Sequence, residues 1–173
     1  MMAKRPADPT NGSATAARQV PMRDFSRSLP MSLLRAREAV MRQFRPKLRE
    51  HGLTEQQWRI LRALAAIEAA EVTELARTAF LLGPSLSRIL RDLEARNLIE
   101  RKTAKADQRR SMVSISKEGV KLMASVAPSS EAIYAEITQR FGARKLAELQ
   151  EMLGELEQSL AGLGTGEEAS AEE

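Results

Sequence analysis

Hydroxyl and guanidinium groups recur along one side of the segment that follows Gly83 and Pro84. These polar residues are Ser85, Ser87, Arg88 and Arg91. An apolar residue recurs every three or four positions between them, which predicts an amphipathic helix with a proline in its first turn: Leu86, Ile89, Leu90 and Leu93. On such a helix, arginine can bind guanine bidentately in the DNA major groove, and serine can bind a base or a phosphate. An ordinary surface helix has the same pattern, so this segment alone leaves both interpretations open.

The segment after Asn97 changes from a helical period to an alternating one. Residues 98–102 and 111–116 predict two short strands, joined by a polar and basic loop over residues 103–110. From Pro84 to Arg110 the chain has eight Lys or Arg and four Asp or Glu, a net charge of +4. A helix followed by a basic hairpin is the winged helix-turn-helix arrangement, with the helix in the major groove and the wing on the flanking backbone or minor groove. The expected fold is therefore mainly α with a small β-hairpin wing.

The wing and its surroundings resemble the MarR family of bacterial transcription regulators, over roughly residues 31–163. The family's Asp-x-Arg wing motif is matched by Asp107-Gln108-Arg109, followed by Arg110 and the segment SMVSISKEG. The resemblance implies that Arg109 enters the minor groove and that Asp107 holds its side chain by an ion pair. It also implies a homodimer that binds double-stranded DNA. The residues expected to contact DNA are Pro84, Ser85, Ser87, Arg88, Arg91, Lys105, Asp107, Arg109 and Arg110.

A narrower resemblance lies in residues 32–64, where RAREA, FRP and LTEQQWRI stand at the spacing found in family members that regulate aromatic-acid degradation. It implies a repressor released by a small aromatic carboxylate of the 4-hydroxyphenylacetate or homoprotocatechuate type. Two alternatives stay open at this point. One is a regulator that answers a different phenolic or a hydroxycinnamate, and the other is a DNA-binding protein with no effector.

An aromatic acid needs a guanidinium for its carboxylate, an apolar slot for its ring and a hydrogen-bonding partner for a phenol. The first two expected helices contain residues that supply all three: Arg37, Phe44, His51, Trp58 and Arg59. The family places its pocket near the first, second and fifth helices, which is compatible with these positions. Trp58 can equally be a core residue, and His51 can be a surface residue beside a helix end.

The composition excludes several classes of function. There is no cysteine and only one histidine, so we expect neither a disulfide, a thiol switch, a metal site nor a cofactor. No nucleophile, metal or phosphate-loop constellation predicts an enzyme. No apolar run approaches the roughly 20 residues that cross a bilayer, and no secretory signal is present, so we expect a cytoplasmic protein without a membrane partner. The net charge of +4 and the pI near 9.8 favour a polyanionic partner.

Several helices are expected to carry the candidate residues. The first helix spans about residues 30–50 and should kink or end early at Pro46. The second begins at a capping box of Thr54 and Gln57 and extends to about residue 66. A short third helix begins near Glu71. After the wing, a long helix over 117–139 should be kinked or interrupted at Pro128, with inward residues that include Val120 and Tyr134.

The last helix, from about residue 143, has leucines in alternating steps of three and four. They form an a/d seam, which favours a partner helix over packing inside one chain. With Leu33 of the first helix, the expected dimer residues are Leu146, Leu149, Leu153, Leu156 and Leu160. The first, fifth and last helices of two chains would interlock, and two recognition helices would read a pseudo-palindrome with half-sites ~10 bp apart.

The sequence thus predicts three regions. Residues 1–28 are a disordered arm, and residues 164–173 are a disordered acidic tail. Residues 29–163 are a MarR-type domain, in which about 30–50 and 117–163 serve dimerisation and about 54–116 form the winged helix-turn-helix.

Overall fold

The computed structural model describes residues 24–104 and 107–161, and their side chains except those of 103–111. The chain divides into two compact units, an N-terminal unit of residues 1–42 and a C-terminal unit of residues 43–173. The expected disordered arm falls almost wholly, and the acidic tail wholly, outside the described residues, as does Lys105.

The N-terminal unit contains a 3-10 helix, η1 (Phe25–Arg27), and the first part of α2 (Leu29–Glu50). Asp24 caps η1: its carboxylate accepts hydrogen bonds from the main-chain N–H and the hydroxyl of Ser26, which lower the pKa of Asp24. The apolar side chains Leu33, Leu34 and Val40 are 39–47% exposed. These apolar side chains are therefore only partly covered within the described residues.

Helix α2 does not end early at Pro46. It continues to Glu50, because proline removes only one backbone hydrogen bond while Phe44 and Leu48 on either side of it are buried. The capping box of Thr54 and Gln57 is confirmed at the start of α3 (Glu55–Ala65). Ile60 is fully buried in α3, whereas Ala65 is exposed.

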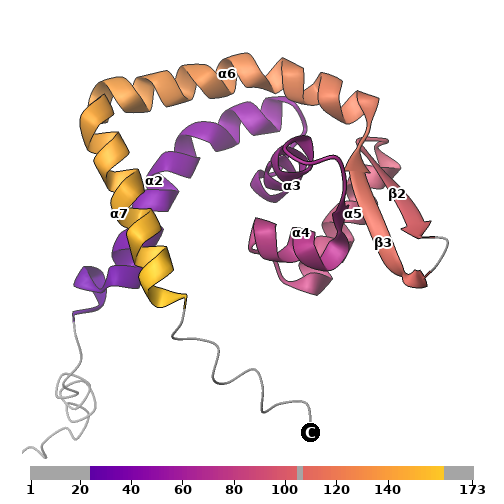
Figure 1. Ribbon diagram of the computed structural model, residues 1–173. Coiled ribbons are helices and arrows are strands. Elements are labelled where there is room, and N and C mark those ends of the chain that lie inside the picture. Colours follow the sequence, from indigo (N-terminus) through magenta and orange to yellow (C-terminus); the bar gives the residue numbers. More distant parts are fainter. Residues whose placement is uncertain (1–23, 105–106, 162–173) are drawn as a thin grey trace, which may run out of the picture. The chain divides into compact units, whose positions relative to one another are not determined.

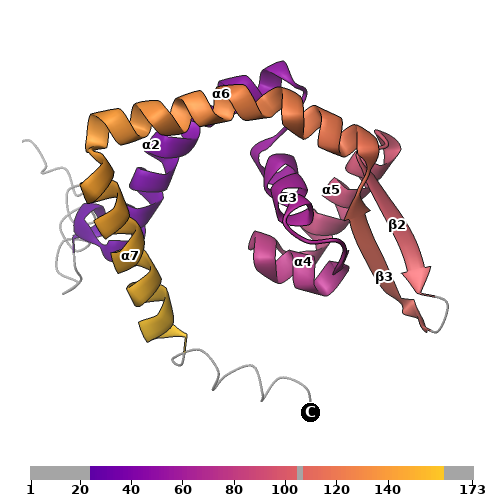
Figure 2. The same cartoon turned by 45° about the horizontal axis from the view of Figure 1, so that its top comes forward.

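The core of the C-terminal unit joins α3, α4 (Val72–Ala79), α5 (Gly83–Ala95) and a small sheet. Figures 1 and 2 show α3 between α6 and α4, with α5 beside the sheet. Each fully buried leucine or isoleucine contributes about 1.5–3 kcal/mol to stability. The side chains with no exposed area include Ile60, Leu61, Leu64, Leu75, Leu86, Leu90, Leu93 and Val113.

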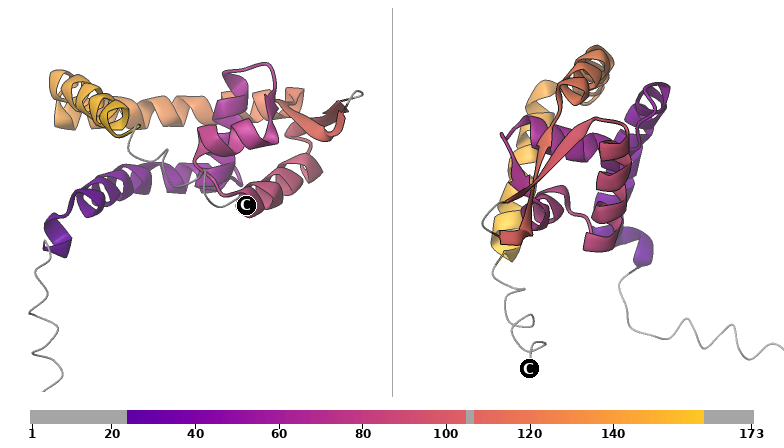
Figure 3. Two further views of the ribbon diagram at one scale, coloured as in Figure 1. Left: turned by 60° about the horizontal axis from the view of Figure 1, so that its bottom comes forward. Right: turned by 90° about the vertical axis from the view of Figure 1, so that its right-hand side faces the viewer.

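The sheet has three antiparallel strands in the order β1-β3-β2: β1 (Ala70–Glu71), β2 (Ile99–Ala104) and β3 (Asp107–Ile115). The predicted polar loop over residues 103–110 is wrong, because pairing continues to Thr103 opposite Ser111 and, past a bulge, to Ala104 opposite Asp107. Backbone pairing outweighs the polarity of an exposed hairpin. The two-residue strand β1, with Ala70 opposite Val113, was missed because it is too short to show a period. The hairpin projects beyond helices α3–α5 (Figure 3).

Helix α6 (Lys117–Phe141) follows β3 and is not interrupted at Pro128. Its buried residues are Gly119, Val126 and Ser130, whereas the predicted inward residues Val120 and Tyr134 are 52% and 44% exposed. A Cβ at Gly119 would lie 2.2 Å from the carbonyl oxygen of Leu98. The first turn of α6 therefore packs closely on the start of the wing.

Helix α7 (Ala143–Leu160) buries none of its residues in the described chain. Leu149, Leu153 and Leu160 are 36–49% exposed, and Leu146 and Leu156 are intermediate. The leucine seam therefore lies on a face that the described residues of this chain do not cover.

Candidate nucleic-acid interface and ligand pocket

Helix α5 presents the predicted DNA-reading face outward. Leu86, Leu90 and Leu93 hold the helix in the core with no exposed area. The other side carries five of the predicted DNA contacts, all of them exposed: Pro84, Ser85, Ser87, Arg88 and Arg91. One helix therefore brings two guanidiniums and two hydroxyls onto one solvent-exposed surface, as the groove of DNA requires.

Polar contacts to α3 and its preceding turn fix the position of α5. The side-chain amide of Gln57 donates a hydrogen bond to the carboxylate of Asp92, and Arg96 donates to the main-chain carbonyl of Gly52 at 2.9 Å. The carboxylate oxygen Oδ2 of Asp92 also lies 3.9 Å from Nη1 of Arg96. The negative charge of Asp92 is thus bound by Gln57 and lies close to Arg96. Arg88 and Arg91 therefore set the charge that DNA would meet on this side of α5.

The turn between α4 and α5 exposes two large apolar side chains that the sequence reasoning did not single out. Phe80 is 81% exposed and adopts a left-handed backbone with φ of 50°, and Leu82 is 79% exposed. The main-chain N–H of Phe80 caps α4 by bonding to the carbonyls of Ala76 and Arg77. Non-glycine residues with positive φ are uncommon, and the α-helical pattern gave no signal for this one.

The wing carries basic residues along both strands. On β2, the side chain of Lys102 is 78% exposed. The guanidinium Nε of Arg101, also on β2, lies 3.8 Å from the carboxylate oxygen Oε2 of Glu94 in α5. Asp107, Arg109 and Arg110 lie on β3, and their side chains are outside the described part, as is Lys105 altogether. The ion pair between Asp107 and Arg109 therefore stays a prediction.

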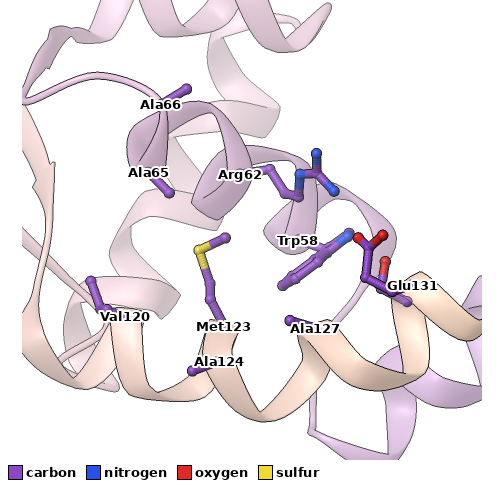
Figure 4. A pocket seen from close by; sticks show the side chains of 10 residues that line it. Trp58, Arg62, Ala65, Ala66, Val120, Met123, Ala124, Ala127 and Glu131 are labelled. Carbon is purple, nitrogen blue, oxygen red and sulfur yellow. The ribbon is translucent and has the colours of Figure 1, made fainter.

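A pocket of about 500 Å³ opens between α3 and α6. The indole of Trp58 lies at one end of the pocket, close to Arg62 and Glu131 (Figure 4). Val120 and Ala65 lie at the opposite end (Figure 4). The lining residues are Trp58, Arg62, Ala65, Ala66, Val120, Met123, Ala124, Ala127, Ser130 and Glu131. The walls are therefore mainly apolar, with a guanidinium, a carboxylate and a hydroxyl among them.

The polar groups of this pocket are unengaged. Within the described residues, Arg62 and Glu131 make no hydrogen bond or ion pair, and the buried hydroxyl of Ser130 has no partner. An apolar cavity with a few unengaged polar groups is the ordinary form of a small-molecule site. The guanidinium suits a carboxylate, and the indole face suits a ring.

Of the five predicted ligand residues, the structure brings only Trp58 to this pocket. Phe44 is buried against Tyr134, with ring centroids 5.0 Å apart, and His51 Nδ1 lies 3.3 Å from the hydroxyl of Ser125. Arg59 donates to the carbonyl of Ala79 and to Glu55, both at 2.9 Å. Arg37 belongs to the N-terminal unit, where it pairs with Glu38.

Arg62 was missed among the ligand candidates, although a signal was present. It follows Trp58 by four positions in α3, so the two side chains share a helix face. Arg59 was predicted instead because it is adjacent to Trp58 in the sequence. Adjacent residues on a helix, however, point to different sides.

Over residues 24–104 and 107–161, no three His, Cys, Asp or Glu side chains are grouped so that they could hold a metal ion. No helix in that same part of the chain is long and apolar enough to cross a membrane.

Comparison with known proteins agrees with this geometry. Residues 51–110 match the model of the MarR family. The homoprotocatechuate degradative operon repressor of Escherichia coli is 41% identical over 128 residues, which cover 74% of this chain and 86% of the repressor. The structure of NadR in complex with 4-hydroxyphenylacetate is 37% identical with a TM-score of 0.68, and covers 79% of this chain and 97% of NadR. The repressor CouR, bound to a 23-mer DNA duplex, is 25% identical with a TM-score of 0.70, and covers 80% and 98% of the two chains.

Proposed function

The chain belongs to the MarR family of transcription regulators, and on that premise we propose that it represses an aromatic-acid catabolic operon until a small aromatic carboxylate releases it. The observation that carries this proposal is the pocket between α3 and α6, where the indole of Trp58 stands beside the unengaged guanidinium of Arg62. The similarity to a homoprotocatechuate operon repressor and to NadR with bound 4-hydroxyphenylacetate supports the same class of effector.

DNA binding is assigned to α5 and to the wing. The guanidiniums of Arg88 and Arg91 would read bases in the major groove, while Ser85 and Ser87 bind bases or phosphates. On the wing, Lys105, Arg109 and Arg110 would contact the flanking backbone and minor groove, with Asp107 orienting Arg109. Pro84 would fix the start of the recognition helix at the DNA surface.

The effector is assigned to the pocket by its chemistry. A carboxylate would pair with Arg62, and the aromatic ring would lie against Trp58 and the apolar wall that includes Met123. A charge-assisted hydrogen bond of this kind contributes about 1.5–3 kcal/mol. Roles for Arg37, Phe44, His51 and Arg59 in effector binding stay predictions of the sequence.

The active form is proposed to be a homodimer. The exposed leucines of α7, together with Leu33 of α2, form apolar surfaces that a second copy would bury. Residues 29–163 would be the working domain, with α2, α6 and α7 serving dimerisation. Two recognition helices would then meet half-sites ~10 bp apart in a pseudo-palindromic operator.

Release would be a shift between two states of the dimer. One state holds the recognition helices at the operator spacing, and the effector binds better to a state in which they are displaced. The effector weakens DNA binding by its differential affinity for the two states, typically ~1–3 kcal/mol. The regulator would act in the cytoplasm, on its operator, and without catalysing a reaction.

Two experiments separate this function from its alternatives. Footprinting of the DNA upstream of the gene at about 0.15 M salt, where non-specific contacts weaken, should show one protected pseudo-palindrome. Protection without sequence preference would instead favour a DNA-binding protein with no effector. Thermal shift with 4-hydroxyphenylacetate, homoprotocatechuate and a hydroxycinnamate should show stabilisation by one of the first two acids. Stabilisation by the hydroxycinnamate alone would assign a different ligand to the regulator.

A further inference from the structure

The hydroxyl of Ser130 is an unusual feature of the pocket wall. Ser130 is only 4% exposed, it lines the pocket, and its Oγ has no hydrogen-bond partner among the described residues. Buried polar groups in proteins nearly always have partners, so an unpartnered one that borders a cavity points to a group that is bound there.

The other serine and threonine hydroxyls of α6 behave differently. Ser125, Ser129 and Thr138 each donate to a main-chain carbonyl one turn back, at 2.7, 2.9 and 2.8 Å. This back-bonding is the ordinary way in which a helix satisfies a serine or threonine side chain. Ser130 has the same neighbours in its own helix but does not back-bond, so its hydroxyl has no partner in the described chain that it would have to give up to a ligand.

The location of Ser130 defines what kind of group it would bind. Ser130 belongs to α6, whereas Arg62 belongs to α3, so the two polar side chains come from the two helices that border the pocket. An aromatic acid that places its carboxylate on Arg62 would span the apolar wall toward α6. A polar substituent carried by the ring would then meet the Ser130 hydroxyl, which can both donate and accept.

We propose that Ser130 is a specificity-determining residue that recognises a hydroxyl group on the ring of the effector. This inference rests on the proposed function. A ring without a hydroxyl fills the pocket but leaves Ser130 buried and unpaired, and a site that contains an unpaired polar group discriminates against such a ligand. The favoured effectors are therefore phenolic carboxylates, as opposed to unsubstituted aromatic acids of the same shape.

The test compares two acids and two variants by isothermal titration calorimetry on the full chain. 4-Hydroxyphenylacetate and phenylacetate differ only in the ring hydroxyl. In the unmodified protein the hydroxylated acid should bind about 10-fold more tightly. Ser130→Ala should bring the ratio of the two dissociation constants close to one by weakening only the hydroxylated acid. Ser129→Ala is the matched control, because Ser129 precedes it in α6, bonds its own helix and does not line the pocket.

The stability of the unliganded variants supplies a second readout. Ser130→Ala removes a buried hydroxyl that has no partner, so its urea midpoint should be unchanged or raised, and it should remain folded for the titrations. A folded Ser130→Ala protein that keeps the 10-fold ratio would overturn this inference and leave the proposed function intact. Loss of the ratio in Glu131→Gln but not in Ser130→Ala would also overturn it and would assign the recognition to Glu131. If the unmodified protein binds neither these two acids nor homoprotocatechuate, both the inference and the proposed function fail.

Discussion

Replacing Arg62 by glutamine should weaken effector binding without weakening the fold. The guanidinium of Arg62 lines the pocket, is exposed, and makes no ion pair or hydrogen bond within the described residues. Losing a charge-assisted hydrogen bond to a carboxylate costs about 1.5–3 kcal/mol, which is roughly a 10- to 150-fold rise in the effector dissociation constant. Because nothing else in the described chain depends on Arg62, the free energy of unfolding should stay within about 0.5 kcal/mol of the original value.

Arg59 is the matched control for this experiment. It lies on the same helix, but its guanidinium bridges the carbonyl of Ala79 and the carboxylate of Glu55. Arg59→Gln should therefore lower the free energy of unfolding by about 1–3 kcal/mol, because it removes the charge-assisted bond to Glu55 and the bond to the Ala79 carbonyl. Its effector affinity should be unchanged in the folded protein.

Calorimetric titration with 4-hydroxyphenylacetate and urea unfolding measure the two effects separately. We expect Arg62→Gln to change the first and Arg59→Gln to change the second. The opposite pattern, with affinity lost in Arg59→Gln and kept in Arg62→Gln, would refute the assignment of the pocket. It would then support the sequence-based prediction that Arg59 binds the effector.

Three other substitutions test separate parts of the account. Gly119→Ala should lower the free energy of unfolding by about 3 kcal/mol in urea titration, because the new Cβ would lie 2.2 Å from the Leu98 carbonyl oxygen; an unchanged midpoint would contradict this packing. Arg88→Ala should weaken operator binding by about 10-fold or more while scarcely changing affinity for unrelated DNA, with Arg144→Ala on α7 as the control in fluorescence anisotropy. Leu153→Lys should shift the protein from dimer to monomer in sedimentation velocity, because a charge in a leucine seam cannot be buried without a partner; a dimer that persists would place the interface elsewhere.

The order and type of the main elements could be predicted from local signals. The capping box of Thr54 and Gln57 marked the start of α3, and the apolar stripe of Leu86, Leu90 and Leu93 marked the buried side of α5. These signals depend on residues close in sequence, so they are legible without the fold. The alternating pattern after Asn97 indicated the wing, and the family resemblance added the roles of Asp107 and Arg109, which no periodicity specifies.

The pocket was harder to predict because it depends on contacts between distant segments. The α6 residues that border it include Val120, Met123, Ala124 and Ala127, which stand at helical spacing, but no local signal says that α3 lies opposite them. The choice between Arg59 and Arg62 depends on where Ala79 and Glu55 lie, because they engage one guanidinium and leave the other to the pocket. The predicted early end at Pro46 and interruption at Pro128 are wrong: both prolines lie inside continuous helices, since neighbouring buried side chains offset one lost backbone hydrogen bond.

The central claim is that an aromatic acid releases this regulator from its operator. The most direct test is fluorescence anisotropy of a labelled duplex from upstream of its own gene, at about 0.15 M salt, titrated with 4-hydroxyphenylacetate and with homoprotocatechuate. The account predicts nanomolar binding that one of these acids weakens about 5- to 150-fold, the range set by a coupling of about 1–3 kcal/mol. Tight and specific binding that neither acid changes would contradict the effector assignment, and the absence of specific binding would contradict the account of the protein as a repressor.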